Sequence, residues 1–475
     1  MSIFLKSLYQ NLCKAYRISK VGKIESKIIM SKYNDFFYMT DVVNKIYTYM
    51  DQPTIVKMTS ICKYFYSTIK FNNFVYHDNK LINFENNYFS ELKKLSIGLY
   101  WITDGQEFNY NIQNINSLSR TVNEIYLCNV NKDLEIDFKK FNIEKLNIYS
   151  SKIKINTFMF NLKNLEISWC KYIIDLQYCV NIEYLTLFIS ELEYFPKNLL
   201  LCNKLKILKL CCDMRYLVNL PDSLNLEKLS LSNYKDHSSD YSTRLNNVDL
   251  PFDKFFKKYK KLKSLYLRAI NIDCVLNDNL ESLDLNLCNI NFLNCPKLTK
   301  LMLRFSTILD YLNLKDNIIE LELHSSTNIY YENFTKILKL SLTNISYDIP
   351  KTVINLKLHS IKKCDLSYCK NLEKIYLWGI TNDVIFSNED TQDNCIHLPE
   401  CNKLKKLTML HCNFGENSNS RSINNFENLE SLNIRFSNIK YIGYHKNLRK
   451  LIFDKSKYIK FHPDLLKKKN LIIKN

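Results

Sequence analysis

A short pattern of apolar and polar positions recurs along most of the chain. Between Leu92 and Ile459 the order apolar-x-x-apolar-x-apolar occurs seventeen times, mostly at intervals of about 18 to 23 residues. Because side chains alternate between the two faces of a strand, the pattern predicts one short strand per repeat. Its first, fourth and sixth residues are expected to enter a shared core, and its third, fifth and seventh to face outward. The repeats begin at Leu92, Val122, Ile143, Leu162, Ile182, Leu205, Leu226, Leu262, Leu280, Leu298, Ile318, Ile337, Val353, Leu372, Leu404, Leu429 and Leu448.

Three copies carry a longer motif that indicates the type of repeat. They read Leu162-x-x-Leu165-x-Ile167-x-x-Cys170, Leu280-x-x-Leu283-x-Leu285-x-x-Cys288 and Leu404-x-x-Leu407-x-Met409-x-x-Cys412. This spacing matches the leucine-rich repeat (LRR) template L-x-x-L-x-L-x-x-N/C-x-L, in which each repeat buries its apolar side by stacking on its neighbours. The sequence therefore predicts a repeat solenoid, a leucine-rich repeat horseshoe with a parallel inner sheet and short extended or 3₁₀ segments on its convex side.

The segment that precedes the repeats follows a helical period instead. Thr40 or Asp41 can cap a first helix, and Pro53 fits the first turn of a second helix, where its missing N–H is not needed. Apolar residues recur at spacings of three and four in both stretches, as in amphipathic helices. Two helices of this length bury little surface alone, so they need either the first repeat or a partner.

This small helical segment resembles an F-box. The resemblance rests on the run Met39-Thr40-Asp41-Val42-Val43-x-x-Ile46-x-x-Tyr49-Met50-Asp51-x-Pro53-x-Ile55-x-x-Met58-x-x-Ile61-Cys62-Lys63-x-Phe65. An F-box followed by leucine-rich repeats is similar to the F-box/LRR proteins, including those carried by large DNA viruses of amoebae. The resemblance implies an adaptor that packs against the ubiquitin-ligase subunit Skp1 through the apolar positions Val43, Ile46, Met50, Pro53, Ile55, Met58, Ile61 and Cys62.

These patterns divide the chain into five segments. We expect an N-terminal extension over residues 1–34, the F-box-like helical segment over 35–72 and a linker or cap over 73–91. The leucine-rich repeat solenoid is expected over 92–460, followed by a C-terminal cap or tail over 461–475. Because a solenoid grows in one dimension, the length of 475 residues does not imply several globular domains.

The net charge of +18 raises nucleic acid and acidic membranes as partners. Many of the lysines fall at the third position of the repeat, where a solvated column on the sheet explains them without a ligand. Neither an aromatic stacking motif nor a zinc finger accompanies the charge, so we do not expect nucleic acid as the partner. The sequence shows no signal peptide and no membrane-spanning stretch. We therefore expect an intracellular protein without a membrane partner, located in the host cytoplasm.

The 16 cysteines follow the repeat and form no C-x-x-C pair. Five of them lie three residues before a repeat start, and three others occupy the ninth position. This periodicity predicts reduced, buried thiols that act as small apolar residues with a weak donor, and neither a metal site nor a cofactor. Cys211 and Cys212, adjacent to each other, are the one pair that could behave differently. No catalytic motif such as a P-loop or H-E-x-x-H is present, so we expect no enzyme activity.

The seventh position of the repeat is the candidate contact surface for a protein target. Tyr, Trp and Arg dominate the binding energy of protein interfaces, and this outward column contains several of them. The candidate residues are Tyr149, Phe188, Arg268, Arg304, His324, His359, Trp378 and Arg435. A solvent-exposed sheet face without a partner is an equally acceptable interpretation of such a column.

Together these observations predict a non-catalytic protein–protein interaction adaptor. In the first hypothesis it is an F-box-type substrate receptor that links a target on the repeats to a Skp1-containing ubiquitin ligase. In the alternative it is a free-standing LRR binding module whose N-terminal helices only cap the solenoid.

Overall fold

The computed structural model of the chain describes those parts in which the repeats lie. It describes residues 73–76, 82–83, 93–97, 112–113, 121–128, 138–150, 157–170, 175–189, 196–222, 224–233, 252–310, 314, 316–325, 334–344, 349–361, 364–366, 369–380, 384–385, 402–412, 422–423, 426–454 and 459–474. The chain divides into two compact units, Met1–Leu162 with Cys170–Tyr172, and Lys163–Trp169 with Ile173–Asn475. Each unit is built from the same kind of repeat.

The first unit contains a ladder of parallel strands. Strand β3 pairs with β1 on one side and β5 on the other, and β5 pairs with β6. The fourth-position residues Leu95, Ile125 and Leu146 meet in this register and are fully buried. The elements of this unit are β1 (Asn73–Tyr76), β2 (Ile82–Asn83), β3 (Lys94–Ile97), β4 (Ile112–Gln113), β5 (Glu124–Cys128), the 3₁₀ turn η3 (Phe138–Lys140) and β6 (Lys145–Tyr149).

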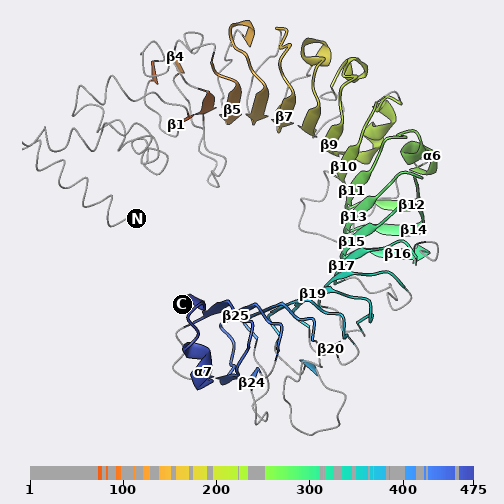
Figure 1. Ribbon diagram of the computed structural model, residues 1–475. Coiled ribbons are helices and arrows are strands. Elements are labelled where there is room, and N and C mark those ends of the chain that lie inside the picture. The colour runs from red at the N-terminus through yellow and green to blue at the C-terminus, as the bar shows by residue number, and fades with distance from the viewer. Residues whose placement is uncertain are drawn as a thin grey trace, which may run out of the picture. The chain divides into compact units, whose positions relative to one another are not determined.

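The second unit continues the same architecture with a longer ladder. Every ladder strand pairs in parallel with the next, and equivalent repeat positions lie opposite one another, as Leu283 does to Leu301. Figure 1 shows these strands side by side along the inner edge of the unit. They are β7 (Asn164–Ser168), β8 (Tyr184–Phe188), β9 (Ile207–Cys212), β10 (Lys228–Asn233), β11 (Ser264–Arg268), β13 (Ser282–Asn286), β15 (Lys300–Arg304), β17 (Glu320–His324), β18 (Lys339–Thr343), β19 (Asn355–His359), β21 (Lys374–Trp378), β23 (Lys406–Leu410), β25 (Ser431–Arg435), β27 (Lys450–Phe453) and β29 (Ile472–Lys474).

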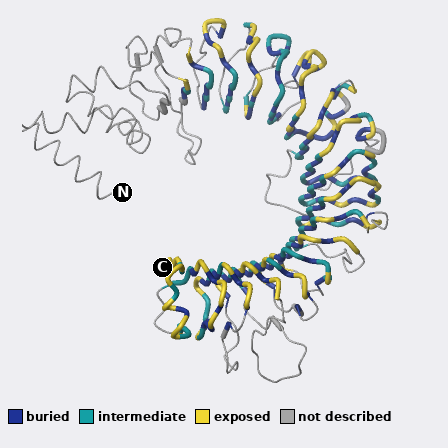
Figure 2. Tube along the Cα trace, in the orientation of Figure 1, coloured by how far each residue is buried: buried dark blue, intermediate teal, exposed yellow. Residues whose placement is uncertain are grey.

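The core lies on one side of this ladder. In strands such as β13 and β15 the second and fourth residues are buried, and the first, third and fifth are partly exposed. Figure 2 shows this alternation recurring from coil to coil. Burying the leucines on one face leaves the other face of the sheet open to solvent, and we call it the open face. The predicted solenoid with a parallel sheet is confirmed in the described part of both units.

Most return paths are short, because most repeats begin about 18 to 23 residues apart. Among the described residues of the second unit, the return paths contain three 3₁₀ turns, two short helices and three small parallel sheets (Figure 1). The predicted short convex segments are therefore confirmed, whereas the small sheets were not foreseen. The return elements are η4 (Leu176–Cys179), η6 (Leu199–Leu201), η7 (Met214–Asn219), α6 (Phe252–Lys257), β12 (Asn271–Leu276), β14 (Asn289–Asn294), β16 (Thr307–Asp310), β20 (Cys364–Asp365), β22 (Val384–Ile385), β24 (Ser422–Ile423), β26 (Tyr441–Ile442), β28 (Lys460–Phe461) and α7 (Pro463–Leu466).

The described cysteines are free thiols, and most are buried. Burial raises the pKa of Cys288 to about 12 and that of Cys412 to about 11. Their thiols donate to the carbonyls of Leu267 and Leu377, each at the sixth position of the preceding repeat. The ninth-position cysteine thus fills apolar space and satisfies a neighbouring backbone oxygen, as the repeat pattern predicted. Within the predicted special pair, Cys212 is buried and Cys211 is partly exposed on the open face.

The F-box-like segment, with all eight of its predicted contact positions, lies outside the described residues. The ladder of each unit includes one strand from a segment expected to flank the repeats. Strand β1 of the expected linker pairs with β3, and β29 of the expected tail pairs with β27. Lys468 closes the last coil by donating to the carbonyls of His445, Lys446 and Leu448.

Candidate protein-interaction surface

The predicted contact column lies at the ends of the ladder strands, on the open face. Parallel pairing places its members side by side in one row of the second unit: Arg268, Asn286, Arg304, His324, Thr343, His359, Trp378, Leu410 and Arg435. Phe188 belongs to the same row but is separated from Arg268 by Cys211 and Ser232. Tyr149 is on β6, in the first unit. The structure therefore brings all the predicted column residues except Tyr149 into one row.

His359 and Trp378 form the aromatic centre of this row. Their ring centroids are 4.3 Å apart, and Trp378 is 44% exposed. Burial, together with the neighbouring His324, lowers the pKa of His359 below its ordinary value. The imidazole is therefore mostly neutral near pH 7 and contributes ring surface more than charge to this pair.

A second row, at the eighth position, was missed by the sequence-based prediction. In the second unit most described residues at this position have left-handed backbone conformations with positive φ: Trp169, Ala269, Leu287, Phe305, Ser325, Asn344, Ser360, Gly379, His411 and Phe436. Ser150 of the first unit has the same conformation. The backbone N–H groups at this position bond to the next strand. The N–H of Phe305 donates to the carbonyl of His324, and that of Gly379 to the carbonyl of Leu410, each 2.9 Å away in the next strand. This ends the strand and turns the chain towards its return path.

Large side chains at such positions are uncommon, because a Cβ is strained at positive φ. Here several are aromatic, and Phe305 and Phe436 are 53% and 65% exposed. Trp169 stacks on Phe188 at 4.2 Å, and Phe305 meets the His324 ring at 4.7 Å. We call this set of exposed or partly exposed rings the aromatic rim: Trp169, Phe305, His411 and Phe436. In these repeats the aromatic rim extends the contact surface from the seventh to the eighth position.

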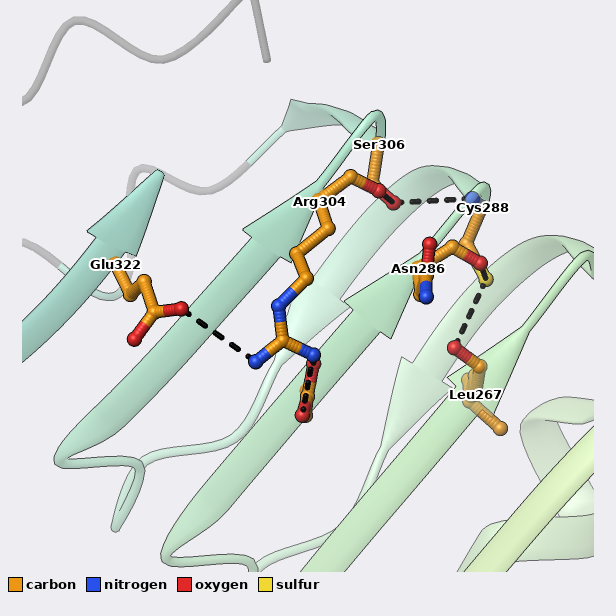
Figure 3. A network of polar contacts seen from close by, with 7 residues as sticks. Leu267, Asn286, Cys288, Arg304, Ser306 and Glu322 are labelled. Atoms are coloured by element: carbon orange, nitrogen blue, oxygen red, sulfur yellow. Dashed lines mark hydrogen bonds and ion pairs between the residues drawn. The ribbon is translucent and has the colours of Figure 1, made fainter. Parts of the chain in front are cut away.

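Charges on strands β13, β15 and β17 neutralise one another. Arg304 lies between two carboxylates, with Nη1 3.3 Å from Asp284 and Nη2 3.4 Å from Glu322 (Figure 3). Glu320 is likewise flanked by Lys300 and by Lys339 of β18. Burial raises the pKa of Asp284, and the Arg304 guanidinium counteracts that rise. We call the three strands the compensated stretch.

Strands β19, β21, β23 and β25 carry charges of one sign. Their sequences NLKLH, KIYLW, KLTML and SLNIR contain four cations and no carboxylate. All four cations are exposed on the open face, and no ion pair links them to a carboxylate in the part of the chain that the structure describes: Lys357, Lys374, Lys406 and Arg435. We call these four strands the basic stretch. It also contains Tyr376 and the His359–Trp378 pair.

The described residues provide neither a cluster of metal ligands nor a membrane-spanning helix. Among the described residues, no three His, Cys, Asp or Glu side chains gather as ligands for a metal ion. None of the described helices is long and apolar enough to cross a membrane.

Comparison with known proteins gives structural similarity only. No family model and no curated protein matches the sequence. A leucine-rich repeat protein of Leptospira interrogans is 14% identical, with 84% of this chain and 100% of that chain covered and a TM-score of 0.41. The TLR13–ssRNA13 complex is 14% identical over 83% and 72% of the two chains, with a TM-score of 0.44. An internalin of Listeria monocytogenes is 18% identical over 70% and 80%, with a TM-score of 0.26. All three TM-scores are below 0.5.

Proposed function

We propose that this protein is a non-catalytic protein-interaction adaptor whose open face holds a protein target. The observation that carries the proposal is the row from Arg268 to Arg435, in which arginine, histidine or tryptophan occupies six of nine positions and which the aromatic rim borders. Such side chains dominate binding hot spots. Because the row stands on a hydrogen-bonded sheet, little backbone conformational freedom is lost when a partner binds.

The second part of the proposal concerns residues 35–72. Their resemblance to an F-box supports binding to a Skp1-type subunit through Val43, Ile46, Met50, Pro53, Ile55, Met58, Ile61 and Cys62. A target on the repeats would then be held near a ubiquitin ligase inside the cell, in the host cytoplasm if the chain is viral. The support for this part is sequence resemblance alone. In the alternative function the same helices only cap the solenoid, and the repeats bind their target without Skp1.

Co-purification of the full chain with a Skp1-type subunit distinguishes these two functions. For an adaptor, Ile46→Glu with Pro53→Glu abolishes the association, because burying unpaired charge costs several kcal/mol. The repeats stay folded by circular dichroism, since each coil depends chiefly on its neighbours. Trp378→Ala, on the open face, is the control and leaves Skp1 bound. Unfolding of the repeats by the first pair of substitutions, or no association of the natural chain, leaves only the free-standing module.

The target surface is tested separately by photo-crosslinking. A benzoyl-phenylalanine in place of Tyr376 should give a specific cross-link to a target protein, and one in place of Phe160 provides the exposed control. Phe160 is 66% exposed and lies outside the contact row. Equal labelling from both positions, or from neither, would contradict the open face as the target surface.

A further inference from the structure

The basic stretch contains an arrangement that is unfavourable for the isolated protein. Lys374 of β21 and Lys406 of β23 are directly opposite each other in the parallel register. Neighbouring strands lie about 4.8 Å apart, and like charges opposite each other destabilise a sheet. Both side chains are exposed, so solvent screens part of the repulsion. The pair adds nothing to the stability of the fold.

The carboxylate next to Lys374 in the sequence forms an ion pair with neither of the two lysines. Glu373, at the edge of the sheet, is 3.1 Å from Lys405. Among the described residues, neither Lys374 nor Lys406 forms an ion pair with a carboxylate. In the compensated stretch, by contrast, Glu320 stands beside both Lys300 and Lys339. The ladder thus accommodates acidic residues between lysines elsewhere and lacks them here.

Apolar surface lies next to the two lysines. Tyr376 is two residues from Lys374 on the same strand and the same face, and Trp378 is two further on. His359 covers one face of the Trp378 ring, and the next residue in the row is Leu410. The exposed part of Trp378 therefore suits packing against an aliphatic or aromatic side chain. Successive stacking of bases requires several free ring faces in line, whereas in this row Trp378 is followed by Leu410.

We propose that the basic stretch binds an acidic, extended polypeptide segment of the partner. In this complex the carboxylates of the segment lie against Lys374 and Lys406, and a neighbouring apolar side chain packs on Trp378. The inference rests on the proposed function, since it names the chemistry of the target that the open face holds. Single-stranded nucleic acid is the competing ligand class. It is disfavoured because the row offers one tryptophan, partly covered by His359, and then Leu410.

The experiment uses the full chain and a fluorescein-labelled peptide of alternating glutamate and leucine, with anisotropy as the readout. Lys374→Glu with Lys406→Glu should weaken binding about tenfold or more, because two exposed contacts are reversed in sign. The matched control is Lys204→Glu with Lys228→Glu, which changes the net charge equally at exposed positions near β9 and β10. It should leave the affinity nearly unchanged. Trp378→Ala should weaken binding of the peptide but not of poly-glutamate, which has no apolar side chains.

Three results would overturn the inference. The first is no binding of the peptide, and the second is an equal loss of peptide affinity in both double variants. The third is that oligo-deoxythymidine binds more tightly than the peptide and that Lys374→Glu with Lys406→Glu abolishes this binding. If charge reversal unfolds the chain, Lys374→Gln with Lys406→Gln replaces it, with a smaller expected loss in the same direction. The failure is distinct from that of the proposed function. If a target cross-links at residue 376 but its binding does not change on substitution of Lys374 and Lys406, only the acidic segment is refuted. If no target cross-links at residue 376, the open-face function is refuted.

Discussion

The compensated stretch and the basic stretch belong to one ladder and have the same kind of core. Their open faces differ in charge. In both, the second and fourth residues of each strand are buried aliphatic side chains. On the open face, Arg304 of the compensated stretch is held between Asp284 and Glu322, whereas Arg435 of the basic stretch is exposed and lacks such partners among the described residues. The core therefore sets the fold in both stretches, and lateral neighbours decide whether a charge is available to a ligand.

The difference has a physical consequence for each stretch. Charges that neutralise one another add modest stability and present little net field to a partner. Unpaired cations of one sign repel one another weakly and attract acidic groups from solution. Binding to the basic stretch should accordingly weaken as salt screens the charges, over a Debye length of about 8 to 10 Å near physiological ionic strength.

The largest effects should be the same in both stretches, because the core is the same. Leu321 and Leu356 occupy the fourth position of their repeats and are 2% and 1% exposed. Leu321→Ala and Leu356→Ala should each cost about 2 to 5 kcal/mol of unfolding free energy, from lost burial and a residual cavity. Urea denaturation measures both. A cost near zero at either site would show that the two stretches do not share one kind of core.

A buried histidine sets the pH range in which the stretches can be compared. His445 lies three residues before Leu448, at the register that cysteine occupies in other repeats, and is fully buried. Burial lowers its pKa to about 4, below the ordinary value near 6.5. Between these values the unfolded chain binds a proton that the folded chain excludes. Stability is therefore fully present above about pH 6.5 and is lost as the pH falls towards about 4, by roughly 3 kcal/mol in all.

Urea denaturation at neutral and at acidic pH measures this loss. His445→Asn should reduce the difference in unfolding free energy between the two pH values, because asparagine does not titrate. The substitution suits this register, which already accommodates a buried amide at Asn277. Other titrating groups contribute equally to both proteins. An unchanged pH dependence in the variant would show that His445 is not its cause. Charge effects on stability are therefore measured at neutral pH or above.

The core could be predicted from the sequence because burial follows the repeat period directly. Leu283 and Leu301 are assigned to the core by their spacing, and the structure pairs them. Hydrogen bonds between coils were not visible in the sequence. The left-handed turn at Phe305 depends on the carbonyl of His324, and glycine marks the equivalent turn only at Gly379 among the described repeats. The aromatic rim was missed for that reason.

Lateral charge pairing was likewise hidden, although it follows once the register is known. Asp284, Arg304 and Glu322 are 18 to 20 residues apart in sequence, so no local pattern connects them. Arg304 was predicted as a contact residue, and its guanidinium is engaged by two carboxylates in the structure. Trp378 was predicted on the same grounds and is exposed in the structure. The F-box-like segment stays a prediction from resemblance.

Removing one arginine from each stretch should reveal their difference in charge pairing. Arg304→Met leaves Asp284 and Glu322 close to each other without a cation, and Asp284 is already partly desolvated. The expected cost is about 1 to 2 kcal/mol. Arg435→Met removes an exposed side chain from the basic stretch and should change stability by less than about 0.5 kcal/mol. Equal costs in urea denaturation at neutral pH would mean that the Arg304 network contributes no stability.

The smallest effect should differ in sign between the two stretches. Lys300 and Lys374 both occupy the third position of their repeats, but Lys300 is 3.3 Å from Glu320 and Lys374 is opposite Lys406. Lys300→Gln should therefore destabilise the protein by a few tenths of a kcal/mol, and Lys374→Gln should stabilise it by a similar amount. Both differences should shrink at high salt, since screening weakens attraction and repulsion alike. Thermal denaturation at low and high salt measures them. If Lys374→Gln destabilises the chain at low salt, Lys374 makes a favourable contact in the free protein, and the basic stretch is not the unsatisfied surface described above.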